Sequence, residues 1–291
     1  MAVVGRPNAG KSTLVNKLVG EKVAIISDRP QTTRNRILSI LSTAEAQVIF
    51  LDTPGQDKLG EHMVRAAEGA IQDVDLVLYV VDASEKFGKG EETILERLRN
   101  SCRVPAILVL NKIDQLGDKS RLLPIIARFQ KEYDFKTVVS LSALEDTDFS
   151  ALLEEIIGCL PYGPDFYPED MYTDQPEKVM AAEIIREKVL QLTRDEVPHA
   201  VAVQVQEMKT RDNGMVYVRA DLFVERDSQK AILIGNKGSM LKEISKRARL
   251  DIEDLVGSRV YLELWVKVRP KWREKEGDLK RLGLASDHNQ Y

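Results

Sequence analysis

One stretch, Gly-Arg-Pro-Asn-Ala-Gly-Lys-Ser at residues 5–12, constrains the fold of this chain more than any other. A short apolar run at residues 2–4 precedes it, and a segment with helical periodicity at residues 13–18 follows it. Strand, glycine-rich loop and helix in this order are the context in which the pattern G-x-x-x-x-G-K-[ST] predicts a phosphate-binding loop. We therefore expect an α/β domain that begins with a nucleotide site.

The chemistry of the loop follows from its residue types. Gly5 and Gly10 permit a tight turn in which backbone N–H groups converge on a phosphate at the positive end of a helix. Lys11 would reach the β- and γ-phosphates and assist catalysis, and Ser12 would place its hydroxyl on Mg²⁺. We predict nucleotide contacts from the whole loop: Gly5, Arg6, Pro7, Asn8, Ala9, Gly10, Lys11 and Ser12.

The length of 291 residues favours two domains, and 43% hydrophobic with 30% charged residues is ordinary for a globular protein. A net charge of −4 neither indicates nor excludes a nucleic-acid binder, and two cysteines are too few for a disulfide framework or a zinc site. We expect no membrane span and no signal peptide. The first strand is short, so either the natural chain begins upstream or the strand is clipped.

A second motif follows the predicted strand at residues 48–51, which pairs with a strand at residues 37–41. Asp52, at the end of that strand, would hold Mg²⁺ across the site from Ser12. Gly55 could bring its backbone N–H close to a γ-phosphate. Nucleotide contacts are expected from Asp52, Thr53, Pro54, Gly55 and Gln56.

Strands and helices alternate through the rest of this half. This order predicts a mostly parallel sheet with helices on both faces, and the pair 37–41 and 48–51 as its antiparallel edge. The expected helices are 59–72, 91–99, 122–133 and 149–160, and the further strands are 74–81, 104–110 and 136–140.

Asn-Lys-Ile-Asp follows the strand at residues 104–110 and predicts guanine specificity. The Asp114 carboxylate can accept the guanine N1–H and 2-amino donors together, whereas adenine would leave it unpaired. Asn111 would tie this loop to the phosphate loop, and the stem of Lys112 would cover the ring. The N–H groups of Ser142 and Ala143 could meet guanine O6.

These motifs, in this order and with Thr32-Thr33 between the first two, resemble the five GTP-binding motifs of translation-factor-type GTPases. The resemblance implies a GTP·Mg²⁺ site in which Thr33 closes on Mg²⁺ and the γ-phosphate only in the GTP state. Thr32 is the less favoured alternative. The loops around Thr33 and Gly55 would be switches that are ordered by the γ-phosphate and released on hydrolysis.

Three prolines between residues 161 and 168 interrupt the alternation and predict a stiff linker. The segment after it predicts an α+β domain with a three-stranded sheet and helices on one face. The expected helices are 177–194, 229–233 and 239–250, and the strands are 200–208, 215–225 and 259–268, with a hairpin turn at 211–214.

Between two of these helices stands Gly-Asn-Lys-Gly, a tight turn that a nucleic-acid backbone can approach, as in KH modules. Residues 226–250 carry seven Lys/Arg against two acidic residues, net +5 in a chain of total −4. Charge therefore favours RNA over a bare helix–helix turn. The expected RNA contacts are Gly235, Asn236, Lys237, Gly238, Lys230, Lys242 and Lys246. A second basic run at residues 267–275 flanks Trp265 and Trp272, of which Trp272 could stack a base, although packing is favoured.

A GTP site followed by a KH (type II) domain resembles the Era family of bacterial GTPases over nearly the whole chain. Pro-Gln-Thr-Thr-Arg at residues 30–34, Tyr-Pro-Glu-Asp at 167–170 and Ser-Gln-Lys-x-Ile-x-Ile-Gly-x-x-Gly at 228–238 carry this resemblance. It implies binding of the 3′ region of 16S ribosomal RNA, assistance in assembly of the small subunit, a cytoplasmic monomer, and peripheral association with the inner membrane. The expected domains are a GTP-binding domain 1–160, a linker 161–176, a KH domain 177–275 and a tail 276–291.

Two positions add hypotheses about hydrolysis. Gln56 stands where the family usually has an apolar residue, in a shortened second switch, and it could orient the attacking water. Asn8 is the loop residue that helps to hold K⁺ in K⁺-dependent relatives. Two other functions stay open: a GTPase whose C-terminal domain binds protein, and an ATPase, which Asp114 disfavours.

Overall fold

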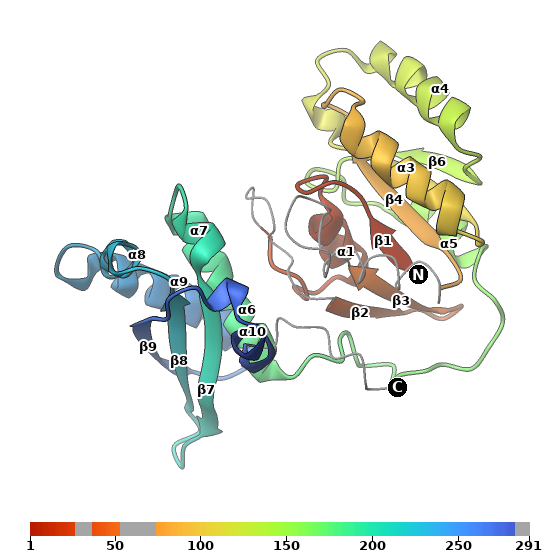
Figure 1. The fold of residues 1–291 in the computed structure, drawn as a ribbon. Coiled ribbons are helices and arrows are strands. Elements are labelled where there is room, and N and C mark those ends of the chain that lie inside the picture. The colour runs from red at the N-terminus through yellow and green to blue at the C-terminus, as the bar shows by residue number, and fades with distance from the viewer. Residues whose placement is uncertain (27–36, 53–73, 283–291) are drawn as a thin grey trace. The chain divides into compact units, whose positions relative to one another are not determined.

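The computed structural model of this chain describes residues 1–26, 37–52 and 74–282, and it forms two compact units (Figure 1). In the described linker region, the first unit ends at Asp174 and the second begins at Gln175. The helix expected at residues 59–72 lies outside the described residues. None of the described helices is long and apolar enough to cross a membrane.

A six-stranded sheet in the order β2-β3-β1-β4-β5-β6 forms the first unit. All neighbouring strands run parallel except β2, which is antiparallel to β3. The mostly parallel sheet with one antiparallel edge is thus confirmed. The strands are β1 (Ala2–Val4), β2 (Ile37–Ser42), β3 (Gln47–Asp52), β4 (Val77–Asp82), β5 (Ala106–Asn111) and β6 (Thr137–Ser140).

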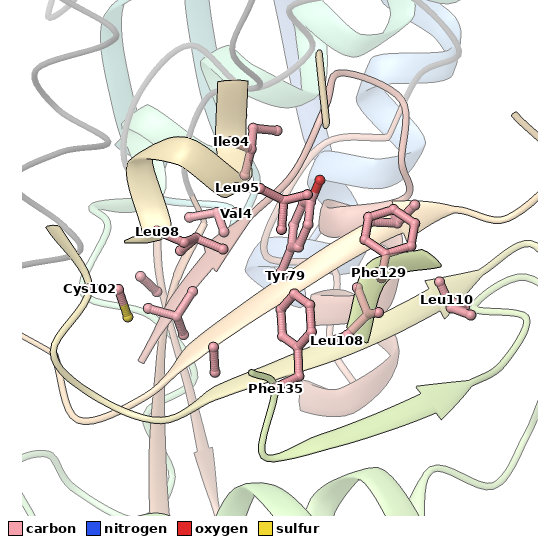
Figure 2. Packing of buried hydrophobic residues seen from close by; sticks show 14 of the residues in the cluster. Val4, Tyr79, Ile94, Leu95, Leu98, Cys102, Leu108, Leu110, Phe129 and Phe135 are labelled. Carbon is pink, nitrogen blue, oxygen red and sulfur yellow. The ribbon is translucent and has the colours of Figure 1, made fainter. Parts of the chain in front are cut away.

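Helices cover both faces of this sheet, which is why β4 and β5 are apolar at almost every position. Helices α1 (Lys11–Val19) and α5 (Ser150–Ile157) pack on one face, where Leu14 and Ile156 are fully buried. Helices α3 (Lys89–Ser101) and α4 (Leu122–Glu132) pack on the other. Figure 2 shows Tyr79 of β4 there, beside Phe129 and Phe135.

The predicted linker is fixed to the antiparallel edge of the first unit over part of its length. The Gln47 side chain of β3 accepts the backbone N–H groups of Phe166 and Tyr167 and donates to the Tyr167 carbonyl, each at 2.9 Å. Thr173 forms a bridge with Ser39 of β2, and its hydroxyl donates to the Leu38 carbonyl at 2.7 Å. The linker therefore covers a strand edge that would otherwise be open to pairing.

The second unit contains a three-stranded sheet in the order β7-β8-β9, with β8 antiparallel to β7 and parallel to β9. Ile244, Ala248 and Ile252 recur every four residues on α9 and are fully buried with the apolar residues of α6 and β8. The elements are α6 (Glu177–Leu192), α7 (Val197–Ala200), β7 (Ala202–Thr210), β8 (Val216–Val224), α8 (Asp227–Ile234), α9 (Ser239–Val256), β9 (Val260–Val268) and α10 (Glu276–Arg281).

Two features of this unit differ from the sequence prediction. Helix α9 continues six residues beyond residue 250, because Ile252 extends the same buried stripe. Residues 276–281, predicted as tail, form α10, and Leu279 packs with Trp272 and Phe223. Since Phe223 alternates with the core residues Leu222 and Val224, α10 lies on the sheet face opposite the other helices.

Candidate functional site

The phosphate-binding motif forms the loop between β1 and α1. Gly10 is the N-cap of α1 in a left-handed conformation with φ 91°, and Asn8 is also left-handed with φ 62°. These two positions turn the chain so that the first turn of α1 begins directly after the loop. The loop therefore lies at the positive end of a helix, the place where proteins bind phosphate.

The two functional side chains of the motif are the first two residues of that helix. Lys11 is buried, and its Nζ donates to the carbonyl oxygens of Arg6 at 2.8 Å and Gly5 at 3.1 Å. Ser12 is partly exposed at the second helical position. A buried ammonium that donates to carbonyl oxygens is suited to exchanging them for the oxygens of a charged phosphate.

Asn111 joins the phosphate loop to the base-recognition loops. Its side chain is 1% exposed, and its Nδ2 donates to the Ala9 carbonyl at 2.8 Å. Its Oδ1 accepts the Ala143 N–H, also at 2.8 Å. A Cβ at Gly10 would lie 2.2 Å from Asn111 Nδ2, so the loop needs glycine here for closeness as well as for backbone conformation.

The base-recognition residues adopt a compact turn. Lys112 is left-handed with φ 61° and caps the 3₁₀ turn η1 (Ile113–Gln115), which presents Asp114 as an exposed side chain. The two N–H groups expected to meet guanine O6 donate within the protein instead. The Ser142 N–H donates to Asp146 at 2.7 Å, and the Ala143 N–H donates to Asn111. Both N–H groups thus have partners within the protein, and their contact with guanine O6 stays a prediction.

Arg6 connects the phosphate loop to the start of α3. Its Nη1 lies 2.9 Å from Glu91 Oε1 and 2.7 Å from Glu85 Oε2, and the hydrogen bond to Glu91 raises the pKa of Arg6. Glu91 also accepts the Gly88 N–H at 3.0 Å. Nearby, burial and the charge of Glu91 raise the pKa of the Tyr79 phenol well above its ordinary value.

Several predicted residues lie outside the part of the chain that the structure describes: Thr32, Thr33, Thr53, Pro54, Gly55 and Gln56. The backbone of Asp52 is described at the end of β3. It pairs with Val3 of β1, two residues before the phosphate loop begins at Gly5. Within residues 1–26, 37–52 and 74–282, no three His, Cys, Asp or Glu side chains cluster as metal ligands.

Asn16 is a structural contributor that motif reasoning missed. From α1, its Oδ1 accepts the N–H groups of Val23 and Ala24, and its Nδ2 donates to the Ala24 carbonyl at 2.7 Å. It therefore fixes the chain shortly before the predicted first switch. The sequence offered little indication of this role, because an asparagine within a helix has no fixed spacing to the loop whose backbone it binds.

In the second unit, the Gly-Asn-Lys-Gly motif forms the turn between α8 and α9. Gly235 ends α8 with φ 71°, Lys237 is left-handed with φ 51°, and Gly238 caps α9 with φ 80°. A Cβ at Gly235 would lie 2.7 Å from Met240 Cβ, whereas a Cβ at Gly238 would meet no atom within 4 Å. The turn is thus tight on one side and open on the other.

The basic residues near this turn fall into two groups. Arg247 and Arg249 are paired with Glu243 and Glu253, each at 2.7 Å. The second group is four lysines, one of them Lys237 in the turn itself. None of the four pairs with an acidic side chain of the described residues. These four are Lys230, Lys237, Lys242 and Lys246.

The second basic run contributes to folding instead. Trp272 is 2% exposed, and its Nε1 donates to the Ala200 carbonyl at 3.0 Å, so it packs and does not stack a base. Its basic neighbours are paired with acidic residues of the same unit: Lys267 with Asp221, Arg269 with Asp278, Lys271 with Glu274 and Arg273 with Glu225.

Comparisons with known proteins match both units. Residues 1–112 match a family described as 50S ribosome-binding GTPase, and residues 196–273 match the KH domain family. The chain is 47% identical to GTPase Era of Halothermothrix orenii and 50% identical to GTPase Era of Clostridioides difficile, with 97% of each chain covered in both cases.

Solved structures agree with these relatives. A variant of Aquifex aeolicus Era bound to GDP·AlF4⁻ is 41% identical to this chain and superimposes with a TM-score of 0.92. A structure of Era with MgGDPNP and nucleotides 1506–1542 of 16S ribosomal RNA is 42% identical, with a TM-score of 0.93. Both alignments cover 98% of each chain.

Proposed function

Because the chain belongs to the Era family of GTPases, we propose that it is a GTP-switched protein that binds the 3′ region of 16S ribosomal RNA and assists assembly of the small subunit. One observation carries this proposal: a phosphate loop tied to a base-recognition turn shares a chain with an open Gly-x-x-Gly turn, beside lysines that pair with no acidic side chain of the described residues. The similar Era structure that holds both MgGDPNP and a 16S ribosomal RNA segment supports it.

The first unit would bind the nucleotide from both ends. Lys11 would release the carbonyls of Gly5 and Arg6 and hold the β- and γ-phosphates, while the loop N–H groups surround them. Ser12, Thr33 and Asp52 would hold Mg²⁺, which neutralises charge on the phosphates. At the other end, Asp114 would accept the guanine donors.

Hydrolysis would depend on the two switch segments. Thr33 and Gly55 would contact the γ-phosphate, and Gln56 would orient the attacking water. Replacing Gln56 by leucine should therefore lower kcat without weakening GDP binding, and an unchanged kcat removes Gln56 from the mechanism. Asn8 would help to hold K⁺ beside the phosphates. Equal kcat values in KCl and NaCl would contradict that role.

The second unit would bind single-stranded RNA at the turn between α8 and α9. The open side of Gly238 leaves room for a phosphate group to approach the backbone, and Lys237 stands within the turn as a cation. Lysines on α8 and α9 extend the positive charge away from the turn. Because neutralising phosphates releases counterions, the affinity should fall steeply as salt rises.

The test is Gly238→Asp with Gly257→Asp as its matched control. Both glycines are left-handed, both face open space, and they cap opposite ends of α9, so both variants carry a similar backbone strain. Gly238→Asp should weaken binding of a single-stranded oligonucleotide by at least about tenfold, because its carboxylate repels the phosphates at close range. Gly257→Asp should bind as the parent does.

Two outcomes would overturn the RNA assignment. If Gly238→Asp binds RNA as well as Gly257→Asp does, the turn is not the RNA site. If the affinity does not change between about 50 and 200 mM salt, phosphate contacts are absent and the domain is better regarded as protein-binding.

The cellular expectations extend the same proposal. The protein would be a cytoplasmic monomer, and a fraction of the molecules would associate peripherally with the inner membrane. Sedimentation at micromolar concentration tests the monomer, and a dimer would contradict it. Membrane fractions washed with high salt test the association, since a peripheral protein is released by the wash.

A further inference from the structure

Asp82, which no motif contains, lies beside the base-recognition turn. It is the last residue of β4, and in the parallel register it stands opposite Asn111, the last residue of β5. Directly beyond this pair, the Ala83 N–H donates to the Asn111 carbonyl at 2.9 Å. The end of β4 is therefore in place to contact whatever follows Asn111.

The Asp82 carboxylate holds two groups with its two oxygens. Oδ2 lies 2.7 Å from Lys112 Nζ, in a pair whose side chains are 12% and 26% exposed. Oδ1 accepts the Ser84 N–H at 2.9 Å and the Ser84 hydroxyl at 2.5 Å. The carboxylate is thus fixed by its own loop before it contacts the lysine.

The same loop contacts η1 at its other end. The Ser84 hydroxyl lies 3.5 Å from Gln115 Oε1, so Lys112 before the turn and Gln115 at its end both face the loop that Asp82 organises. Lys112 is left-handed, a conformation that costs a lysine about 1 kcal/mol and persists only where surrounding contacts impose it. Asp114, which carries base specificity in the proposed function, lies between them.

We infer that Asp82 is a positioning residue for guanine recognition, holding the Lys112 ammonium so that the lysine stem and the η1 turn are set before the base arrives. This inference rests on the proposed roles of Lys112 and Asp114. Without the carboxylate, the ammonium is drawn to water and the stem loses its fixed direction. Part of the binding free energy must then be spent on ordering the turn.

The protonation state of Asp82 fits this role. Burial alone would raise the pKa of its carboxyl, but the hydrogen bonds from Lys112 and Ser84 outweigh burial and lower it below the ordinary value. Asp82 is therefore ionised at neutral pH. Since its folded pKa is lowered, the stabilisation from the pair is complete above the ordinary carboxyl pKa and is lost as the pH falls through the lowered folded pKa.

Asp82→Asn is the test, because asparagine keeps the shape and one acceptor oxygen while removing the charge. Asp118→Asn is the control: Asp118 also accepts the N–H and the hydroxyl of the serine two residues later, on Oδ1 and Oδ2, but it is exposed and no lysine of the described residues pairs with it. Asp82→Asn should weaken GDP binding by about fivefold, equivalent to about 1 kcal/mol, and Asp118→Asn should leave it unchanged.

A double-mutant cycle with Lys112→Met separates positioning from general destabilisation. If Asp82 acts through the lysine, Asp82→Asn should have no further effect on GDP affinity in the Lys112→Met background. An undiminished fivefold effect there, or parent-like affinity of the single variant, overturns the inference. Failure of the underlying base assignment has its own readout: Asp114→Asn would then not weaken GDP relative to xanthosine diphosphate.

Discussion

Replacing Asn111 by alanine removes both hydrogen bonds that join the phosphate loop to the loop at residues 142–143. The amide is 1% exposed, and the two residues that it contacts, Ala9 and Ala143, are each 2% exposed. The Ala9 carbonyl and the Ala143 N–H would therefore lose their partner at a site that water reaches poorly. Asn111→Asp is the informative comparison, because a carboxylate still accepts the Ala143 N–H but cannot donate to Ala9.

The expected loss of stability follows from the two backbone groups that lose their hydrogen-bond partner. An unsatisfied buried polar group costs about 1–3 kcal/mol, so the loss of two partners in Asn111→Ala should destabilise the first unit by about 2–6 kcal/mol without nucleotide. Local opening at Ala143 should become easier by about 2 kcal/mol, which makes its amide exchange about 30-fold faster. Asn111→Asp should keep Ala143 protected and still weaken GDP binding.

Hydrogen exchange read at single residues is the assay, with the amide of Leu108 in β5 as an internal reference. Leu108 reports global opening of the same core, so the ratio of Ala143 to Leu108 exchange isolates the local effect. The reasoning is refuted if Ala143 exchanges no faster relative to Leu108 in Asn111→Ala than in the parent. Equal loss of Ala143 protection in both variants would also refute it.

Three further predictions concern stability. Trp272→Ala should destabilise the second unit by about 3–5 kcal/mol in urea unfolding, since it empties a buried site and strands the Ala200 carbonyl; a loss below about 1 kcal/mol would mean that the site is not a core. Glu91→Gln should lower the free energy of unfolding by no more than about 1 kcal/mol, seen as a small drop in melting temperature, because the paired Arg6 is substantially exposed. The raised pKa of Tyr79 means that its contribution is complete below about pH 10 and is lost as the pH rises above it; Tyr79→Phe should remove this part of the alkaline destabilisation measured by circular dichroism.

Local motifs carried most of what the sequence could predict. The loop at residues 5–12 and the alternation of apolar runs with amphipathic segments predicted a mostly parallel sheet with helices on both faces and one antiparallel edge, because parallel strands need crossover connections. The bond from Asn111 to the phosphate loop was also predictable, since both motifs lie at the same edge of the sheet.

Pairs that depend on exact register were not predictable. Arg6 and Glu91 are 85 residues apart, and nothing in either segment identifies the other as its partner. Asp82 reaches Lys112 only because β4 and β5 end level with each other. Likewise, the Ser142 N–H is occupied by Asp146, a residue that carries no motif. Such contacts follow from the assembled fold, and they are where the sequence analysis missed functional residues.

The contact between Gly10 and the Asn111 amide restricts how this protein can vary. A methyl group at position 10 cannot coexist with the amide as placed, and a smaller side chain at position 111 strands two buried backbone groups. A substitution at either residue alone therefore destabilises the contact between the two loops. Two motifs far apart in the chain are thus coupled through one contact, and we expect a change at either position to require a compensating change at the other.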